Sequence, residues 1–227
     1  MSARIDHAVI MAAGRGQRMM PATQYMPKAM VPYAESTLIA RGIDKLRPDI
    51  EQIHVTVGYK GAMLAAHLIE HQVTSIHNTD GKPNSWWIHH TLLRELDEPV
   101  FVLTCDNVTD IDFAELAADY FALGAPPCLL VPVAPVPGLD GDFIWHEYQV
   151  VTRLSRDDPA PTYACGIQVL NPARIAASTP PVGDFGTIWE TLIARRELMV
   201  ARVQPKKWYS VDTVEHLAHA AERMGGA

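Results

Sequence analysis

Short apolar segments alternate with segments of amphipathic helical periodicity along most of this chain. In the first part, the predicted strands cover residues 7–11, 52–57, 73–77, 99–104 and 128–133. The predicted helices cover residues 37–46, 60–71, 85–96 and 112–121. Such alternation is typical of βαβ units, in which right-handed crossovers place helices on both faces of a mainly parallel sheet.

The pattern changes near residue 135. Proline and glycine are frequent from residue 126 to 141, and residues 143–154 alternate like a hairpin or a bent antiparallel strand. Further strands are predicted at residues 163–170 and 199–203, and further helices at 185–195 and 214–224. We therefore predict one α/β domain, residues 1–227, with a mixed, mainly parallel sheet flanked by helices and a C-terminal antiparallel lid.

Charge and cysteine usage narrow the class of protein. The formal net charge is -7, whereas a general binder of nucleic acid or of anionic membranes carries a basic excess. The three cysteines, Cys105, Cys128 and Cys165, form no CxxC pair, and no apolar run reaches the length of a membrane span. We expect a cytoplasmic protein with no nucleic-acid or membrane partner; the sequence leaves the oligomeric state open, a homo-oligomer included.

The segment Ala12-Ala13-Gly14-Arg15-Gly16-Gln17-Arg18-Met19 follows the first predicted strand directly. Glycines allow backbone N–H groups to approach a phosphate chain without a Cβ in the way. A dinucleotide-binding GxGxxG turn is disfavoured because Met19 stands at the third glycine position, and no Walker A motif occurs. Arg15, Arg18 and the later Lys28 supply several cations, which suit a triphosphate.

This loop, extended by Pro21, Thr23, Pro27, Lys28, Val31 and Pro32, resembles the N-terminal signature AAGxGxRMxPxTxxxPKxMV of the sugar-1-phosphate nucleotidyltransferases. The chain is similar to their short, single-domain members, such as those for N-acetylmuramate 1-phosphate or phosphocholine. The resemblance implies a Rossmann-like, GT-A-type fold with a nucleotide-binding half, residues 1–134, and an acceptor-binding half, residues 135–227. It also implies that the substrates are an NTP and a small phosphorylated acceptor, a sugar 1-phosphate, with pyrophosphate as the second product.

The resemblance assigns roles to individual residues. It places Arg18 on the β- and γ-phosphates and Lys28 beside the α-phosphate, as the two catalytic residues. The implied nucleotide-binding residues are Ala12, Ala13, Gly14, Arg15, Gly16, Arg18, Lys28, Gly58, Asn84, Ser85 and Asp106. Ser85 serves equally well as a helix N-cap.

Two acids are candidates for a Mg²⁺ site. Asp106 ends an apolar strand, and ligands of open parallel sheets bind at the carboxyl ends of the strands. Asp212 lies in a segment that resembles the family's late W-x-D-x-G-T motif, although it could instead cap the last helix. Mg²⁺ usually takes one or two carboxylates from protein and the rest of its ligands from substrate and water.

The acceptor side is less clearly marked. The candidate acceptor-binding residues are Trp87, Asn107, Tyr148, Gly166 and Lys207. The tryptophans around residue 87 could equally belong to a core stripe, and paired lysines in a loop are usually solvated. Three alternatives to the sugar-phosphate reaction remain: a cytidylyltransferase for a non-sugar phosphate such as phosphocholine, a non-catalytic nucleotide-binding regulator and, less favoured, an NAD oxidoreductase.

Overall fold

A computed structural model describes residues 4–181 and 183–224 of the chain. Two compact units are formed from segments that are not contiguous in sequence. The glycine-loop unit consists of Asp6–Lys82, Leu103–Asp110 and the segment from Lys206 onward. The hairpin unit consists chiefly of Pro83–Val102 and Ile111–Pro205.

The glycine-loop unit contains three parallel strands in the order β5-β4-β1. Their bounds are β1, His7–Ala12; β4, Gln52–Val57; and β5, Ser75–Asn78. Helix α1, Leu38–Leu46, connects β1 to β4, and helix α2, Gly61–Glu70, connects β4 to β5 and packs on both. The β4 strand is buried over five of its six residues, because it pairs with a strand on each side and helix α2 packs on it.

The remaining elements of this unit are short. They are the 3₁₀ turns η1, Gln17–Met19, η2, Ala22–Gln24, and η3, Lys28–Met30, the ribbon β2, Pro32–Tyr33, with β3, Ser36–Thr37, and helix α7, Val214–Met224. A second ribbon pairs β7, Asn107–Asp110, with β13, Lys207–Ser210, antiparallel. This ribbon joins residues about a hundred positions apart in the sequence.

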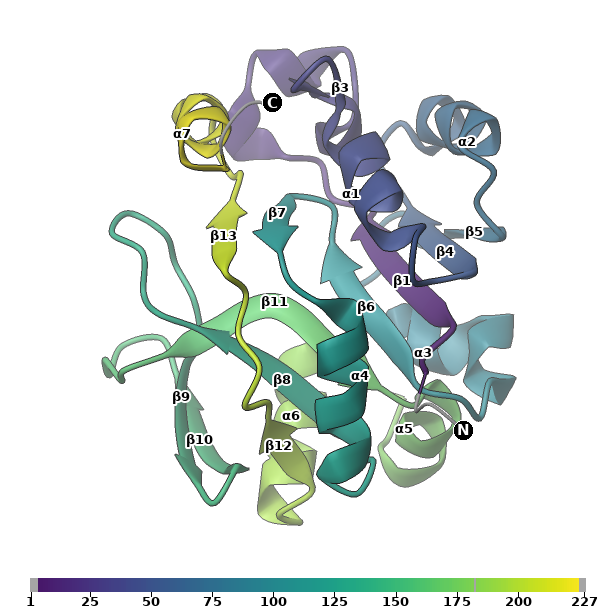
Figure 1. Ribbon diagram of the computed structural model, residues 1–227. Helices are drawn as coiled ribbons and strands as arrows, with labels where there is room; N and C mark the ends of the chain where they lie inside the picture. The colour runs from purple at the N-terminus through teal and green to yellow at the C-terminus, as the bar shows by residue number, and fades with distance from the viewer. Residues whose placement is uncertain (1–3, 182, 225–227) are drawn as a thin grey trace. The chain divides into compact units, whose positions relative to one another are not determined.

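The hairpin unit contains the strand order β6-β11-β8-β12-β10-β9 (Figure 1). The strands are β6, Val100–Thr104; β8, Cys128–Val133; β9, Phe143–Glu147; β10, Val150–Ser155; β11, Tyr163–Leu170; and β12, Leu198–Val200. The helices are α3, Trp86–His90; the 3₁₀ helix η4, Leu92–Glu95; α4, Phe113–Ala122; α5, Pro172–Ser178; and α6, Phe185–Ala194. Strand β11 runs antiparallel to both β6 and β8, whereas β12 is parallel to β8, so the sheet is mixed.

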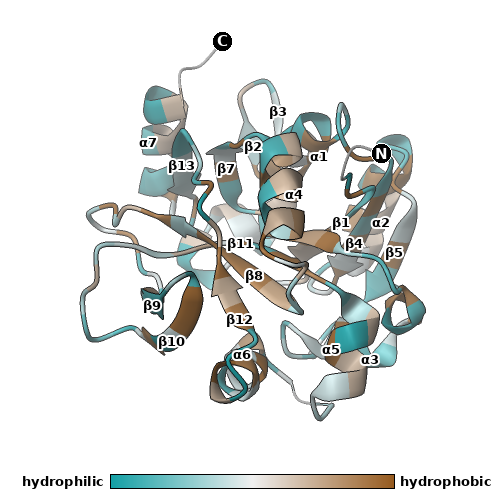
Figure 2. Ribbon diagram, turned by 60° about the horizontal axis from the view of Figure 1, so that its bottom comes forward, coloured by the Kyte–Doolittle hydropathy of each residue, from teal (hydrophilic) through white to brown (hydrophobic). Residues whose placement is uncertain are grey.

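The core of the hairpin unit is built on β8, of which all six residues are buried. Figure 2 shows hydrophobic colouring along β8 and along the neighbouring β12. Burying one large aliphatic side chain contributes roughly 1.5–3 kcal/mol, so the continuous apolar run at 128–131 stabilises this sheet strongly. At the start of α4, Asp112 accepts a hydrogen bond from the backbone N–H of Glu115 at 2.9 Å, which is the predicted N-cap.

The predicted mixed α/β architecture is confirmed, and so is the antiparallel hairpin, which consists of β9 and β10. The single helix predicted over residues 85–96 is wrong. It breaks into α3 and η4 at Thr91, whose backbone is extended and whose side chain caps the second segment by accepting from Leu93. Helix α5 was not predicted, although Asn171 at its N-cap and Pro172 at its first position are recognised start signals.

Two of the larger-scale expectations are not decided by these elements. The division into halves at residue 134 and the placement of the C-terminal antiparallel structure as a lid over the mouth of the sheet stay predictions. None of the helices within residues 4–181 and 183–224 combines the length and hydrophobicity that a membrane crossing requires.

Candidate active site

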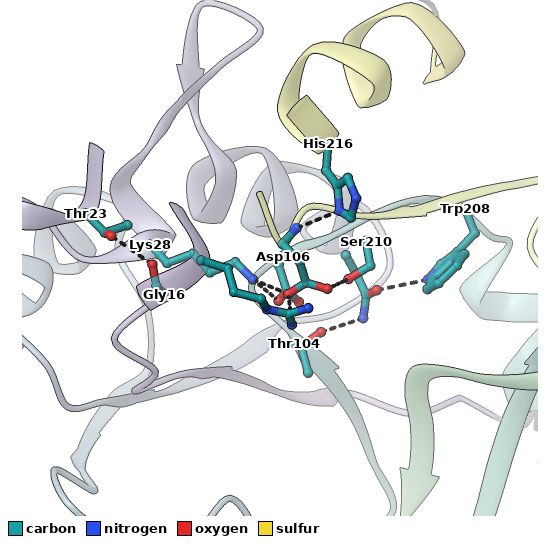
Figure 3. A network of polar contacts seen from close by, with 11 residues as sticks. Gly16, Thr23, Lys28, Thr104, Asp106, Trp208, Ser210 and His216 are labelled. Atoms are coloured by element: carbon teal, nitrogen blue, oxygen red, sulfur yellow. Dashed lines mark hydrogen bonds and ion pairs between the residues drawn. The ribbon is translucent and has the colours of Figure 1, made fainter. Parts of the chain in front are cut away.

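The glycine loop folds back against the segment that carries Lys28. Gly16 has a positive φ of 65°, and a Cβ at this position would lie 2.7 Å from the Lys28 Cβ, which no side chain can tolerate. The Thr23 hydroxyl donates a hydrogen bond to the Gly16 carbonyl at 2.8 Å (Figure 3). Gly14, by contrast, has no neighbouring atom within 4 Å of such a Cβ, so the space beside its backbone is open.

The loop is also held from the side of β4. A Cβ on Gly58 would lie 2.6 Å from the Ala13 carbonyl oxygen, and the N–H of Tyr59 donates to the same oxygen at 3.1 Å. Ala12 is buried, and its N–H donates to the Thr56 hydroxyl at 3.3 Å. Ala12 and Gly58, both predicted to bind nucleotide, are buried and support the loop through these contacts, and their part in nucleotide binding stays a prediction.

Lys28 lies between two carboxylates. Its Nζ donates to Oδ2 of Asp106 at 2.5 Å and to Oδ1 of Asp212 at 2.9 Å (Figure 3). The residue is only 7% exposed, because η3 directs the side chain inward from the end of the glycine loop. The guanidinium of Arg18 lies 2.9 Å from the same Asp212 oxygen, although the Arg18 side chain is 61% exposed. The structure thus brings the two predicted catalytic residues and the two predicted metal ligands together in one cluster.

The β7–β13 ribbon is what joins the two acids. Asn107 pairs with Ser210 across it, and the N–H of Val211 donates to the Asp106 carbonyl at 3.0 Å. Asp106 comes directly before one strand of the ribbon and Asp212 follows shortly after the other. Antiparallel pairing in this register therefore places both carboxylates at the same end of the ribbon.

The charges in this cluster stabilise one another. Burial lowers the pKa of the Lys28 ammonium, but the Asp106 and Asp212 carboxylates outweigh it, and the net pKa lies above the ordinary value for lysine. Burial raises the pKa of Asp212, whereas Lys28 and Arg18 lower it, and the net shift is downward. Burial, with the nearby Asp106 carboxylate, raises the pKa of the Cys105 thiol to about 12, so this cysteine is a neutral thiol at physiological pH.

Residues 8–157 match the family model of the MobA-like NTP transferase domain, which is well over half of the chain. The chain belongs to the MobA-like NTP transferase family. In this NTP transferase domain, the matched region includes the whole glycine loop, Lys28 and Asp106.

Relatives of known activity include the N-acetylmuramate alpha-1-phosphate uridylyltransferase of Caulobacter vibrioides. It is 28% identical over 207 residues, which cover 82% of this chain and 84% of that protein. A mannose-1-phosphate guanyltransferase of Neurospora crassa is 26% identical over 183 residues, which cover 74% of this chain. The chain spans only 50% of that enzyme, and 58% of the one from Debaryomyces hansenii.

Solved structures share the fold of this chain. The inositol-1-phosphate CTP transferase from T. maritima superposes with a TM-score of 0.78 at 12% identity, covering 98% of both chains. The CTP:phosphocholine cytidylyltransferase from Streptococcus pneumoniae superposes with a TM-score of 0.75 at 19% identity, covering 97% of this chain and 99% of that one. At these identities the likeness establishes a common fold.

A series of side-chain hydrogen bonds supports the β7–β13 ribbon. The Asn107 side chain donates to the Thr104 hydroxyl at 2.6 Å and accepts from Nε1 of Trp208 at 2.9 Å (Figure 3). The N–H of Asp212 lies 3.3 Å from Nδ1 of His216. Both ends of the Asn107 amide are engaged, so Asn107 orients the ribbon, and its contact with the acceptor stays a prediction. Sequence reasoning missed Thr104 and His216, although His216 stands four residues after Asp212 at the start of a helix.

Arg15 lies apart from the acidic cluster. Its guanidinium is 5.2 Å from the centre of the Tyr59 ring, and the Lys60 ammonium is 5.4 Å from the same ring centre. The Tyr59 hydroxyl in turn donates to the Thr23 carbonyl at 3.2 Å. Arg15 is therefore held beside the loop by a cation–π contact, which is compatible with a role as a further phosphate ligand.

The other predicted ligand-binding residues differ in accessibility. Trp87 is 1% exposed, so its ring belongs to the core, as the alternative of a core stripe implied, and its contact with the acceptor stays a prediction. Ser85 is wholly buried at the start of α3, and no side-chain capping bond is present there, so both functions considered for it lack support in this structure. The Asn84 side chain accepts a hydrogen bond from the N–H of Phe185 at 3.1 Å, which fixes the start of α6.

Three predicted acceptor residues remain accessible. Tyr148 forms the tip of the β9–β10 hairpin and is 94% exposed. Gly166 has a positive φ of 79° in the middle of β11, where the register with β8 shifts. Lys207 is exposed on β13, opposite Asp110. Their part in acceptor binding stays a prediction.

Proposed function

We propose that this protein transfers a nucleotidyl group from an NTP to a sugar 1-phosphate, which yields an NDP-sugar and pyrophosphate. The observation that carries the proposal is the convergence of Arg18 and Lys28 on the carboxylates of Asp106 and Asp212. Cations suited to phosphate and acids suited to a divalent ion lie within hydrogen-bond distance of one another, beside an open glycine loop.

The donor set fits Mg²⁺. Two carboxylates from different segments converge on a single cation, Lys28 Nζ, so the same oxygens can face a metal ion. Among residues 4–181 and 183–224, no group of three or more His, Cys, Asp or Glu side chains is arranged to hold a metal. A site that offers only two carboxylates leaves the remaining positions to substrate oxygens and water, as is usual for Mg²⁺ but not for structural zinc. Asp106 and Asp212 would hold the ion, which would neutralise charge on the phosphates.

In the proposed reaction, an oxygen of the acceptor phosphate forms a bond to the α-phosphorus as the bond from that phosphorus to the pyrophosphate oxygen breaks. The attacking phosphate is already ionised near neutral pH, so no side chain has to remove a proton. Lys28 would stabilise the charge that develops on the α-phosphate, and Arg18 with Arg15 would hold the departing pyrophosphate. Positioning and electrostatic stabilisation supply the rate acceleration.

The relatives support a sugar 1-phosphate as acceptor. Both kinds of relative named above carry a sugar 1-phosphate in their names, and they differ in the nucleotide. The fold alone does not separate this acceptor from phosphocholine or inositol phosphate, since transferases for both share it. For the setting of the reaction, we retain the cytoplasm proposed from the sequence.

A pyrophosphate-release assay tests the proposal. Each of the four NTPs is supplied with Mg²⁺ and a panel of sugar 1-phosphates, with phosphocholine and inositol 1-phosphate as alternative acceptors. We expect release with one NTP and at least one sugar 1-phosphate. Release only with phosphocholine would establish the cytidylyltransferase alternative, and NTP binding without release under any combination would establish the non-catalytic regulator.

A further inference from the structure

The two cations assigned to the phosphates are held by the two acids assigned to the metal. Lys28 Nζ contacts both carboxylates, at 2.5 and 2.9 Å, and Arg18 shares the Asp212 oxygen at 2.9 Å. In this arrangement the phosphate-binding groups and the metal-binding groups neutralise each other.

We propose that Lys28 is a place-holding cation, which excludes the free divalent ion until nucleotide arrives and draws the ammonium away. The proposal rests on the proposed function, because it takes Asp106 and Asp212 as the metal ligands. It adds that metal and NTP enter together, by an exchange of partners: the ammonium moves from carboxylate to phosphate as the carboxylates accept the metal.

Charge balance favours this exchange. Two carboxylates face two cations, so the half-buried cluster is neutral as a whole. A free divalent ion that approached the same oxygens would meet the Lys28 ammonium within 3 Å of them, and this repulsion is weakly screened where water is excluded. An NTP removes the obstacle because its phosphates offer Lys28 and Arg18 new negative partners.

Lys28 is the main place-holder of the two cations. Its side chain is 9% exposed, against 61% for Arg18, so the Arg18 contact is screened by solvent and contributes less. Lys28 also touches both acids, whereas Arg18 touches Asp212 alone. Removal of Lys28 therefore takes a cation away from both carboxylates, and removal of Arg18 takes one away from Asp212 alone.

Binding of Mn²⁺ without nucleotide, followed by the electron paramagnetic resonance of the free ion, tests the proposal on the whole chain. We expect Lys28→Met to bind Mn²⁺ at least about tenfold more tightly than the wild type, a difference of about 1.4 kcal/mol. Lys45→Met is the matched control. Lys45 also contacts an aspartate, Asp110, at 2.8 Å in the same unit, and its loss changes the net charge equally. We expect no change in Mn²⁺ affinity for this control.

A second variant covers the case in which Lys28→Met does not fold, as judged by circular dichroism. Arg18→Gln alters a largely exposed side chain, and we expect a smaller gain in Mn²⁺ affinity, of about threefold, within the range of exposed ion pairs. Equal Mn²⁺ affinity in the wild type and in whichever of these variants folds would overturn the place-holding proposal.

The same titration with NTP present separates this proposal from the proposed function. One outcome is that Mn²⁺ binds the wild type in the presence of NTP while the variants, without NTP, bind Mn²⁺ no more tightly than the wild type. That result would support the metal site and contradict the place-holding role of Lys28. If Mn²⁺ binds the wild type under neither condition, the metal assignment of the proposed function fails as well. The expected gain should also vanish in Lys28→Met combined with Asp106→Asn, because one of the two ligands is then lost.

Discussion

Two lysine–aspartate contacts in the glycine-loop unit have similar distances but different surroundings. Lys45 lies 2.8 Å from Asp110, with both side chains close to half exposed. Lys28 lies 2.5 Å from Asp106, is buried and contacts a second acid. An exposed pair is worth little because water and salt screen it, whereas a buried cation needs its counter-charges. Burial and the number of partners, more than distance, distinguish the candidate active site from an ordinary surface ion pair.

A buried histidine in the same unit shows what happens without counter-charges. His54, in the middle of β4, is 7% exposed and faces His7 and Ser75. Burial, together with the nearby His7 and His77, lowers the pKa of His54 to about 4, so it is neutral where Lys28 is charged. Of these two buried cationic groups, the one that stays charged is the one that two carboxylates compensate.

The largest effect is expected from Lys28→Ala. Loss of one preorganised charge contact typically lowers turnover by about 10²–10³-fold, and we expect this range in the pyrophosphate-release assay. Lys45→Ala, which removes the exposed lysine, should leave the rate within about twofold of the wild type. A folded Lys28→Ala variant with near wild-type turnover would remove Lys28 from the catalytic assignment.

The two aspartates extend the same comparison. Asp106→Asn keeps the size of the side chain but removes a charge, and we expect a loss of about 10²-fold in Mg²⁺-dependent turnover. Asp110→Asn changes the partner of Lys45, and turnover of this variant should depend on Mg²⁺ as it does in the wild type. The measurement is the rate of pyrophosphate release as a function of Mg²⁺ concentration; an unaltered Mg²⁺ profile in Asp106→Asn would contradict the metal assignment.

The uncompensated histidine predicts a dependence of stability on pH. The pKa of His54 is lower in the folded than in the unfolded protein. Below pH 6.5, His54 therefore binds a proton in the unfolded chain but stays neutral in the folded protein. Folding stability therefore falls as pH decreases toward 4, by about 1.4 kcal/mol at pH 5.5 for this group.

Urea unfolding at pH 7.5 and pH 5.5 measures this contribution. In His54→Asn, the loss of stability on acidification should be smaller than in the wild type by about 1.4 kcal/mol. His219→Asn, which alters an exposed histidine on α7, is the control and should behave like the wild type. An equal loss in His54→Asn and the wild type would show that His54 is not held neutral by the fold.

The smallest effect concerns the support of the β7–β13 ribbon. Trp208→Phe keeps a buried ring but deletes the Nε1 hydrogen bond to Asn107, so the free energy of unfolding should fall by about 1 kcal/mol. Trp145→Phe, on the exposed hairpin, should change stability by less than about 0.5 kcal/mol. Urea unfolding measures the free energy of unfolding of both variants and of the wild type. If Trp208→Phe and Trp145→Phe are equally stable, the hydrogen bond has no structural role.

Local patterns predicted much of the fold. The strands at β4, β8 and β11 agree with their apolar runs to the residue, and α7 begins and ends where its periodicity does. Each of these segments carries its own signal in hydrophobic spacing. The break of the predicted helix at Thr91 was not foreseen, because its cause is an extended backbone at one residue inside an otherwise helical pattern.

The candidate site was predicted in its residues but not in its connections. The spacing of the glycine loop and of Lys28 is local, and the end of an apolar strand marked Asp106. The register of β7 with β13 depends on contacts between residues 107–110 and 207–210, which no local pattern contains. For the same reason the role of Asn107, as a bridge between Thr104 and Trp208, could not be foreseen.

The central claim is that one cluster of cations and acids binds a triphosphate together with a divalent ion. Calorimetric titration of the preferred NTP, with and without Mg²⁺, into the wild type and Asp106→Asn tests it most directly. We predict that Mg²⁺ tightens NTP binding to the wild type at least tenfold, about 1.4 kcal/mol of coupling, and that the coupling disappears in Asp106→Asn. NTP binding to the wild type that is indifferent to Mg²⁺ would contradict the account.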